Sequence, residues 1–274
     1  MLLDGALVLA VCATPIGNLE DVTLRVLREL AEADLVLCED TRHTRRLLER
    51  HGIRARLRSY HEHNEAARTA ELMPRLQGGE RIALVSDAGL PGISDPGARL
   101  VAAALEGGVA VTVLPGASAV DTALVASGFA AERYQFVGFL PRGGQALRRT
   151  WEELARWPWP AVAFESPRRL PATLRSLAAE DPDRRLAVCR ELTKRHEQVA
   201  RGPAAALAEQ FAEPPKGEIT LVLGPGGKGE PVDVVAAAEA VAQLVADGVA
   251  RRQAAGIVAR LTGLPRRQLY DMSL

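Results

Sequence analysis

The chain has 274 residues, 47% of them hydrophobic and only 4% aromatic, which predicts roughly two domains with aliphatic cores. Its 34 basic and 34 acidic residues cancel, so no overall basic field marks it as a nucleic-acid binder, although a local basic patch would be enough for that role. The scattered cysteines Cys12, Cys38 and Cys189 have neither metal-ligand nor disulfide spacing, and no segment reaches membrane-spanning length. We therefore expect a cytoplasmic protein with no metal site and no membrane anchor.

Short apolar strands alternate with amphipathic helices up to Leu114. Strands are expected at Ala6–Cys12, Leu35–Cys38, Arg56–Tyr60, Ile82–Val85 and Val109–Leu114. Helices are expected at Val22–Ala33, Thr41–His51, Asn64–Gln77 and Ala98–Glu106. Candidate amino-terminal caps are Asp21, Thr41 and Asp95. Repeated strand–helix units with apolar strands predict a mostly parallel sheet that is covered on both faces.

The rhythm changes after Leu114, where the segment 115–119, PGASA, precedes another helix that ends near Ser127. The strands that follow have fewer helices between them, which favours a second α/β domain with antiparallel pairing. They are expected at Gln135–Phe139, Ala161–Phe164, Leu186–Arg190, Glu197–Arg201 and Glu218–Leu223.

The carboxyl-terminal part combines a linker with a small helical domain. Residues 224–231 have the composition of a flexible linker, and they lack the Ser or Thr that a phosphate loop needs after Lys228. Helices are expected at Val234–Val245, Arg251–Leu261 and Pro265–Tyr270. Their arginines either form a docking surface for nucleic acid or are simply solvated; they are Arg251, Arg252, Arg260, Arg266 and Arg267. The expected domains are residues 1–116, 117–225 and 232–274.

The segment Ser86–Gly97, SDAGLPGISDPG, is the most informative in the chain. It follows an apolar strand and carries three glycines, two prolines and the aspartates Asp87 and Asp95. Glycine lets a ligand approach the backbone closely, and proline fixes the shape of a loop in advance. Because ligands of open α/β sheets bind at the carboxyl ends of strands, we interpret this segment as a ligand loop rather than a plain connector.

Three more polar loops follow the first three expected strands, at Ala13–Asn18, Glu39–Thr44 and His61–Glu65. In a parallel sheet all four loops lie at one edge, which predicts a binding cleft there. The two histidines of the third loop, with Glu62 and Glu65, could ligate a metal. Substrate binding or helix capping is favoured, because no convincing further ligands accompany them.

The common nucleotide and hydrolase motifs are missing from the sequence. No G-x-G-x-x-G opens a helix after the first strand, which counts against an ordinary dinucleotide site and against the commonest methyltransferase fold. Without a G-x-S-x-G elbow or a phosphate loop, hydrolase and kinase functions are also disfavoured.

Several motifs, taken in order, resemble those of a known family. TPIGNLED at 14–21, EDTRHT at 39–44, HEHNE at 61–65, SDAGLPGISDPG at 86–97 and PGASA at 115–119 together look like the tetrapyrrole-methylase-type methyltransferases. Within them the chain most resembles the RsmI-type 16S rRNA (cytidine-2'-O)-methyltransferases. GFLPR at 138–142, FESPRRL at 164–170, RELTKRHE at 190–197, KGE at 216–218 and the terminal LPRRQLYDMSL extend the match over nearly the whole chain.

The resemblance implies a fold and a cofactor. The fold would consist of two α/β domains of tetrapyrrole methylase type with a cofactor cleft between them, followed by a small helical domain. The cofactor would be S-adenosyl-L-methionine, with the strand after Lys216 closing one side of the cleft. By resemblance its binding residues are Pro15, Ile16, Asp87, Ala88, Gly89, Leu90, Ile93, Ser118, Ala119 and Phe164.

The implied reaction is methyl transfer to the 2'-oxygen of a cytidine ribose in the decoding centre of 16S rRNA. A ribose hydroxyl is a very weak acid, so a base or a charge-stabilising group should help. Our first candidates are Asp40 and His43, with Glu39; others on this edge are His61, His63, Glu65 and Glu165. Any of these could instead hold RNA, and Asp40-Thr41 could simply cap a helix. The candidate substrate-binding residues are Arg42, His61, His63, Asn64, Glu65, Arg168, Arg169, Arg266 and Arg267.

Two other functions compete with this one. A small-molecule acceptor such as a corrin precursor would keep the fold and cofactor, but it does not explain the EDTRHT and HEHNE loops or the basic tail. A non-catalytic RNA-binding module would have no use for the glycine-rich cofactor loops. The expected partners are 16S rRNA in the small ribosomal subunit and, by resemblance, a second copy of the chain.

Overall fold

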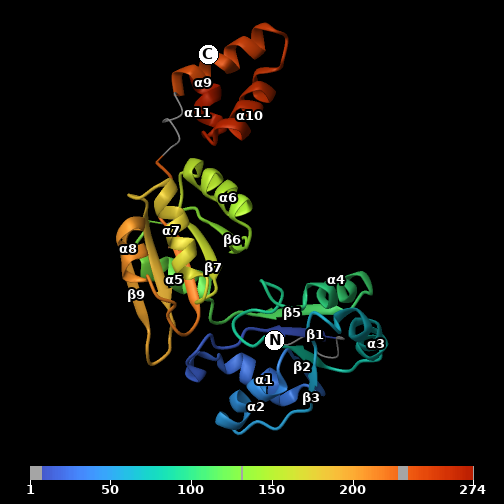
Figure 1. Cartoon of the computed structure of the whole chain (residues 1–274). Helices are drawn as coiled ribbons and strands as arrows, with labels where there is room; N and C mark the ends of the chain where they lie inside the picture. Colours follow the sequence, from blue (N-terminus) through green and yellow to red (C-terminus); the bar gives the residue numbers. More distant parts are fainter. Residues whose placement is uncertain (1–7, 131, 228–233, 274) are drawn as a thin grey trace. The chain divides into compact units, whose positions relative to one another are not determined.

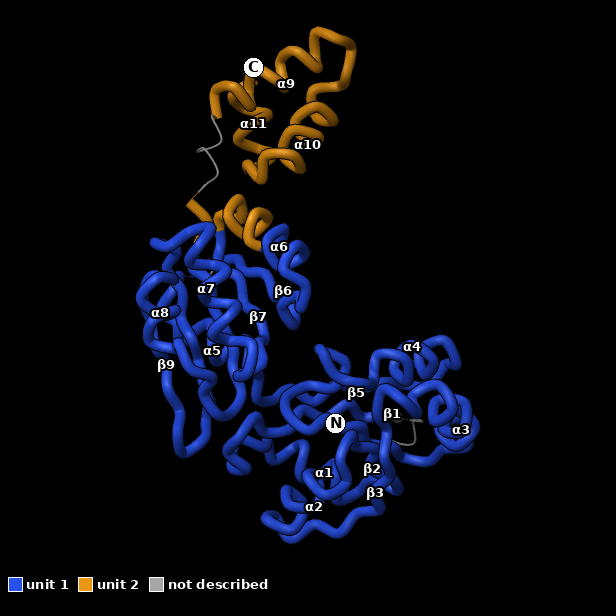
Figure 2. Tube along the Cα trace, viewed as in Figure 1, with its two compact units in different colours: residues 1–150, 159–224 blue, residues 151–158, 225–274 orange. Residues whose placement is uncertain are grey.

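The computed structural model describes residues 8–130, 132–227 and 234–273 (Figure 1). The chain divides into two compact units: Met1–Thr150 with Trp159–Gly224, and Trp151–Pro158 with Pro225–Leu274 (Figure 2). The first unit contains two five-stranded sheets. Each unit is described by itself below.

The first sheet is entirely parallel, as the sequence predicts, with the strand order β3-β2-β4-β1-β5. Its strands are β1 (Val8–Cys12), β2 (Leu35–Cys38), β3 (Leu57–Ser59), β4 (Ile82–Leu84) and β5 (Ala110–Leu114). The helices between them are α1 (Leu24–Glu32), α2 (Thr41–Arg50), α3 (Glu65–Gln77) and α4 (Ala98–Glu106).

Helices cover both faces of this sheet. On one face, Val26 and Leu30 of α1 pack with the strand residues Ala10 and Val36. On the other, side chains of α3 and α4 pack against alternate residues of the same strands; these include Leu72, Leu76, Leu100, Leu9 and Leu37. With both faces buried, the carboxyl edge of the strands is where their polar loops remain open to a ligand.

The second sheet has the order β6-β7-β10-β8-β9 and is mixed. Its strands are β6 (Gln135–Phe139), β7 (Ala161–Glu165), β8 (Arg185–Arg190), β9 (Gln198–Pro203) and β10 (Ile219–Leu223). The strand β10 runs antiparallel to both of its neighbours, which confirms the predicted antiparallel pairing. The helices of this region are α5 (Ala119–Ser127), α6 (Gly144–Arg156), α7 (Leu170–Glu180) and α8 (Ala204–Gln210).

The loop after β1 links the two sheets. Ile16 from this loop is buried in the core of the second sheet, with Val120 of α5 and Val162 of β7. One residue further on, a Cβ at Gly17 would lie 2.5 Å from Cγ of Lys194, so only glycine fits this approach. The backbone amide of Asn18 then donates to Oγ1 of Thr193 at 3.0 Å.

The predicted helix caps are wrong at all three positions. Thr23, not Asp21, caps α1, because Leu19–Asp21 forms a separate 3₁₀ turn. Asp40, not Thr41, accepts the Arg42 amide at 2.8 Å, which makes Thr41 the first residue of α2. The helix α4 begins only at Ala98, after Gly97 at φ 138°, so Asp95 is free of a capping role.

Three short helices form the carboxyl-terminal bundle, as predicted. They are α9 (Val234–Ala246), α10 (Arg251–Thr262) and α11 (Arg266–Met272). Their shared core contains Val241, Ala254 and Leu269. Residues 228–231 of the predicted linker lie outside the described residues. Over the part of the chain that the structure describes, no helix combines the length and hydropathy needed to cross a membrane.

Candidate active site

The four polar loops meet at one edge of the first sheet, where the sequence places them. Thr14 and Gly89 exchange backbone hydrogen bonds of 2.8 and 3.1 Å, which join the loops after β1 and β4. Oδ1 of Asp87 accepts the backbone amide of Asp40 at 3.1 Å and so ties in the loop after β2. Oε1 of Glu65 accepts the amide of Gly97 at 3.1 Å, which adds the loop after β3.

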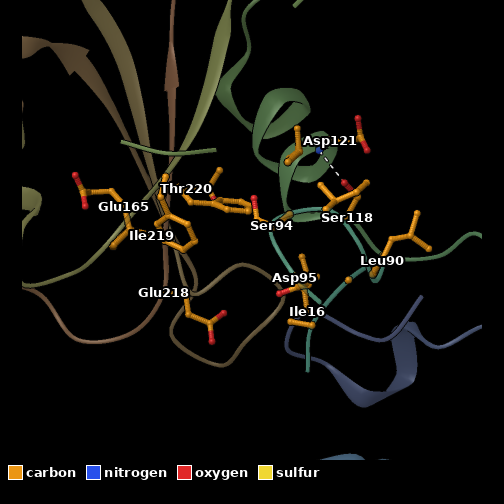
Figure 3. Close-up of a pocket in the computed structure, with 18 of the residues that line it drawn as sticks. Ile16, Leu90, Ser94, Asp95, Ser118, Asp121, Glu165, Glu218, Ile219 and Thr220 are labelled. Atoms are coloured by element: carbon orange, nitrogen blue, oxygen red, sulfur yellow. Dashed lines mark hydrogen bonds between the residues drawn. The ribbon is translucent and has the colours of Figure 1, made fainter. Parts of the chain in front are cut away.

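A pocket of about 560 Å³ opens at this edge (Figure 3). Its lining comes from the loops after β1, β4 and β5, from the start of α5, and from β6, β7 and β10 of the second sheet. The predicted cofactor residues that line it are Ile16, Ala88, Gly89, Leu90, Ile93, Ser118, Ala119 and Phe164. Pro15 and Asp87 are not among the lining residues; Pro15 is buried beside the pocket and Asp87 holds the loop of Asp40.

An aromatic group forms part of the pocket wall. Phe164 contacts Phe136 and Phe139 edge-to-face, with ring centroids 4.9 and 5.5 Å apart. Phe139 is 60% exposed although it is large and apolar. A half-open aromatic wall of this kind can pack against a flat heteroaromatic ring.

The charged residues of the pocket are all acidic. The lining contains carboxylates and, among the described residues, no Lys, Arg or His; the acidic residues are Asp95, Asp121, Glu165 and Glu218. A concave surface lined by one sign of charge attracts a ligand of the opposite sign. The pocket is therefore suited to a ligand with a positive charge and an apolar body.

Three of these carboxylates already have strong partners. Asp121 accepts from the hydroxyl of Tyr134 at 2.9 Å. Glu165 accepts from the Ser166 amide and from Oγ1 of Thr173, each at 2.6 Å, and pairs with Nε of Arg169 at 3.2 Å. Glu218 pairs with Nζ of Lys194 at 3.1 Å. Glu165, a predicted candidate base, is thus fully engaged in holding its own loop.

Asp95 differs from the other three. In the part of the chain that the structure describes, no cation pairs with it. Its burial, followed by the negative charges of Glu39 and Asp87, raises the pKa of Asp95 to about 6, against a lowering by the Ser86 hydroxyl. Asp95 therefore changes charge near the physiological range.

The three predicted catalytic residues lie outside the pocket lining. Hydrogen bonds from the side chain and backbone of Arg42 hold the pKa of Asp40 well below its usual range, so Asp40 accepts a proton poorly. His43 is exposed on α2. Burial, and then the negative charge of Asp87, raises the pKa of Glu39. The charge of Asp87 also raises the pKa of Asp95.

The HEHNE loop is held by its own hydrogen bonds. Oδ1 of Asn64 accepts the His61 amide at 3.0 Å, and the Asn64 amide nitrogen lies 2.9 Å from Nε2 of His61. The rings of His61 and His63 meet edge-on at 6.0 Å. Within the described residues, no group of three His, Cys, Asp or Glu side chains is arranged to hold a metal.

The predicted RNA-binding arginines have different surroundings. Arg42 is 83% exposed and Arg168 is exposed, although Arg42 also pairs with Asp40. Arg169 instead donates to the carbonyls of Leu140 and Pro141 at 2.7 and 2.9 Å, inside its own domain. In the terminal bundle, Arg266 donates to the carbonyl of Arg252 at 2.8 Å and Arg267 is 94% exposed.

Phe139 and Asp121 line the pocket but were given no role from the sequence. Ser94 and Asp95 belong to the predicted ligand loop, and Glu218 and Thr220 belong to the strand after Lys216 that was expected to close the cleft, although none of the four was named as a cofactor residue. The GFLPR motif contains Phe139, so part of the signal was present. Only the packing of the second sheet shows which positions of this motif face the pocket.

Comparison with known proteins gives consistent matches. Residues 8–208 match the family described as Tetrapyrrole (Corrin/Porphyrin) Methylases, and residues 232–274 match the RsmI C-terminal HTH domain. A Synechocystis protein is 44% identical, covering 97% of both chains, and one from Halalkalibacterium halodurans is 43% identical, covering 95% of this chain and 92% of its own; both are named ribosomal RNA small subunit methyltransferase I.

Solved structures agree with this fold. The methyltransferase CobJ aligns with a TM-score of 0.62 at 20% identity, covering 81% of this chain and 95% of its own. The uroporphyrin-III-C-methyltransferase from Thermus thermophilus aligns with a TM-score of 0.55 at 21% identity, covering 79% and 94%. These likenesses concern the fold alone.

Proposed function

The chain belongs to the tetrapyrrole methylase family, within the group whose curated members are named ribosomal RNA small subunit methyltransferase I, and on that premise we propose that it methylates 16S rRNA with S-adenosyl-L-methionine. The acceptor we propose is the 2'-oxygen of a cytidine ribose in the decoding centre. The observation that carries the cofactor part is the pocket of about 560 Å³, because it combines apolar walls with purely acidic charge.

The pocket residues fit this cofactor. When bound, S-adenosyl-L-methionine supplies an electrophilic methyl group on a positively charged sulfonium sulfur. Leu90, Ile93 and Phe164 offer apolar contacts for its adenine ring, and the backbone of the Gly89 loop can approach it closely. Asp95 and Asp121, the lining carboxylates with no cationic partner among the described residues, match the sulfonium and ammonium charges.

On the RNA side, we propose that exposed cations contact phosphates while the pocket takes the reacting ribose. The acidic lining repels phosphate, so the backbone of the RNA has to be held outside it, by side chains such as Arg42 and Arg168. Arg266 and Arg267 on the terminal bundle would add contacts to folded RNA. The proposal includes a homodimer that acts on small ribosomal subunits in the cytoplasm.

The test uses tritiated cofactor and small subunits from a strain that lacks this methylation. We expect label on one cytidine ribose, located by nuclease mapping. Ala119→Trp fills the pocket and should abolish cofactor binding and labelling, whereas Val125→Trp on the same helix, at a position 82% exposed and outside the lining, should change neither. Cofactor binding by calorimetry without any RNA label would instead favour a small-molecule acceptor.

A separate comparison tests the RNA contacts. Subunits should be methylated more slowly by Arg267→Glu, with unchanged cofactor affinity, because Arg267 projects into solvent. Equal methylation of naked 16S rRNA and of assembled subunits would argue against a subunit substrate.

A further inference from the structure

We propose that Arg142 and Arg168 form a phosphate clamp at the border of the pocket, which holds the RNA backbone beside the ribose that is methylated. The pair of Glu165 and Arg169 positions the two loops that carry this clamp. The inference rests on the proposed function and deepens it, because it assigns the contact with the RNA backbone to one place on the second sheet.

The loops after β6 and β7 lie side by side at the pocket. The two strands are parallel neighbours, so both loops leave the sheet at the same edge (Figure 1). The backbone amide of Leu140 donates to the carbonyl of Phe164 at 3.2 Å, where the strands end. Phe139 at the end of β6 and Pro167 after β7 both line the pocket. A group that is held by either loop therefore lies at the border of the pocket.

Arg169 joins these two loops to each other. Its Nη2 donates to the carbonyls of Leu140 and Pro141 at 2.7 and 2.9 Å, and its Nε pairs with Oε1 of Glu165 at 3.2 Å. The side chain of Glu165 is 0% exposed and also accepts from Oγ1 of Thr173 at 2.6 Å. A buried network with its hydrogen bonds satisfied is rigid. Arg169, which was expected to bind substrate, thus holds the loops in place.

The two arginines next to this network are exposed and unpaired. Arg142 directly follows the residue whose carbonyl Arg169 binds, and Arg168 directly precedes Arg169. Arg148 of α6 pairs with Glu180 at 3.1 Å, but within the described residues neither Arg142 nor Arg168 has a carboxylate partner. A guanidinium group binds phosphate through two parallel hydrogen bonds. Two free guanidinium groups on rigid, adjoining loops therefore suit a phosphate of the RNA backbone.

The acidic pocket explains why such a clamp is needed at this border. When a ribose 2'-oxygen enters the pocket, the phosphates of the same nucleotide are close to a lining whose charged residues are all acidic. Cations at the border offset this repulsion and fix the backbone without reading the base. Arg42, another exposed arginine, is already paired with Asp40 at 2.7 Å. The observations therefore favour Arg142 and Arg168 for this contact.

The experiment measures methylation of small subunits by the wild-type chain, Arg142→Gln and Arg168→Gln at several salt concentrations. Loss of one phosphate contact should raise KM for the subunit about tenfold and lower the slope of log KM against log salt by about 0.7–0.9. The calorimetric Kd for the cofactor should change by less than about twofold, because neither side chain lines the pocket. Arg168→Lys keeps the charge and should keep most of the slope.

Arg175→Gln is the matched control for these two variants. Arg175 is an exposed arginine of α7 in the same region of the chain, and it lies outside the pocket lining. The substitution removes the same charge, so a general effect of net charge on RNA binding would appear here as well. We expect KM and the salt slope to stay at their wild-type values.

Arg169→Lys tests whether Arg169 positions the clamp. Lysine keeps the positive charge but lacks the planar fork that joins two carbonyls and a carboxylate. KM for the subunit should rise, and Arg142→Gln should then raise it further by much less than in the wild-type background. An equal effect of Arg142→Gln in both backgrounds would show that Arg169 does not position Arg142.

The clamp is overturned if Arg142→Gln and Arg168→Gln both keep the wild-type KM and salt slope, or if Arg175→Gln lowers the slope by the same amount. In either case, label on the RNA with the wild-type chain would leave the proposed function standing. Absence of that label would overturn the proposed function, and the clamp with it.

Discussion

The loops after β2 and β4 both carry aspartates, but the surroundings of these aspartates differ. Each places an aspartate at the same edge of the first sheet. Asp40 caps a helix and is paired with Arg42, whereas Asp95 lies in the pocket between acidic neighbours. The difference teaches that the pKa of a carboxylate at a ligand-binding edge is set by its partners, and not by its position.

The largest effect should come from disturbing the shape of the Asp95 loop. Gly97→Ala would place a Cβ 2.9 Å from Cδ2 of Leu84 at a φ that L-residues rarely adopt. Gly52, after α2, has φ 67°, also positive, and a Cβ there would meet no atom within 4 Å. We expect Gly97→Ala to lower the free energy of unfolding by about 1–3 kcal/mol more than Gly52→Ala.

Urea unfolding and calorimetric cofactor binding check this difference. Cofactor affinity should fall in Gly97→Ala and remain normal in Gly52→Ala. Equal stability of the two variants would mean that the β4 loop is no more constrained than the α2 end.

A second effect separates the loops by the pH dependence of stability. The pKa of Asp95 is raised to about 6 in the folded chain, so its stabilising contribution is present in acid and is lost as the pH rises through that value. Above it, ionised Asp95 destabilises the fold. Asp95→Asn should therefore raise Tm by about 2–4 °C above pH 7, with no gain below about pH 4.

Asp40→Asn should have the opposite effect on Tm; scanning calorimetry measures the Tm of both variants. The pKa of Asp40 is lowered, so its contribution is present at neutral pH and disappears only in strong acid. Tm at pH 7 should fall slightly. A Tm gain at high pH for both variants would erase the distinction between the loops.

The effect of Asp40→Asn on activity should be small. Asn still caps helices, and the Arg42–Asp40 pair is exposed, so kcat of Asp40→Asn should stay within about threefold of the wild type. Single-turnover labelling of small subunits measures this. A 100-fold loss would show that Asp40 takes part in the reaction.

The smallest effect concerns the neighbour of Asp95. Glu39→Gln removes a negative charge that raises the pKa of Asp95, so the Asp95 carboxyl should titrate at lower pH in this variant, as followed by NMR. An unchanged titration would show that Glu39 and Asp95 do not interact.

The sequence was sufficient to predict the strands, the helices and the parallel sheet of the first half, because apolar strands alternate there with periodic helices. The helix Ala98–Glu106 and the strand Leu35–Cys38 were predicted with their observed bounds. Caps failed because Asp21, Thr23, Asp40 and Thr41 all have capping side chains, and only the backbone path decides among them.

The site was predictable as a set of loops but not as a set of roles. Parallel strands bring their carboxyl ends together, so the meeting of the four loops followed from topology. Phe139 and Glu218 come from a mixed sheet, for which no comparable rule places the ends of strands. The pKa of Asp40 is lowered by Arg42, and that of Asp95 is raised by burial and by Glu39; no sequence pattern encodes these contacts.

The burial of Ile16 in the core of the second sheet has a consequence for how the first unit can be divided. A fragment that begins at Ala117 would contain every strand of the second sheet and would still lack the side chain that packs against Val120 and Val162. Two fragments cut at residue 116 would have to reassociate to complete that core and, with it, the pocket. Methyltransferase activity would then be recovered only when the two fragments are combined.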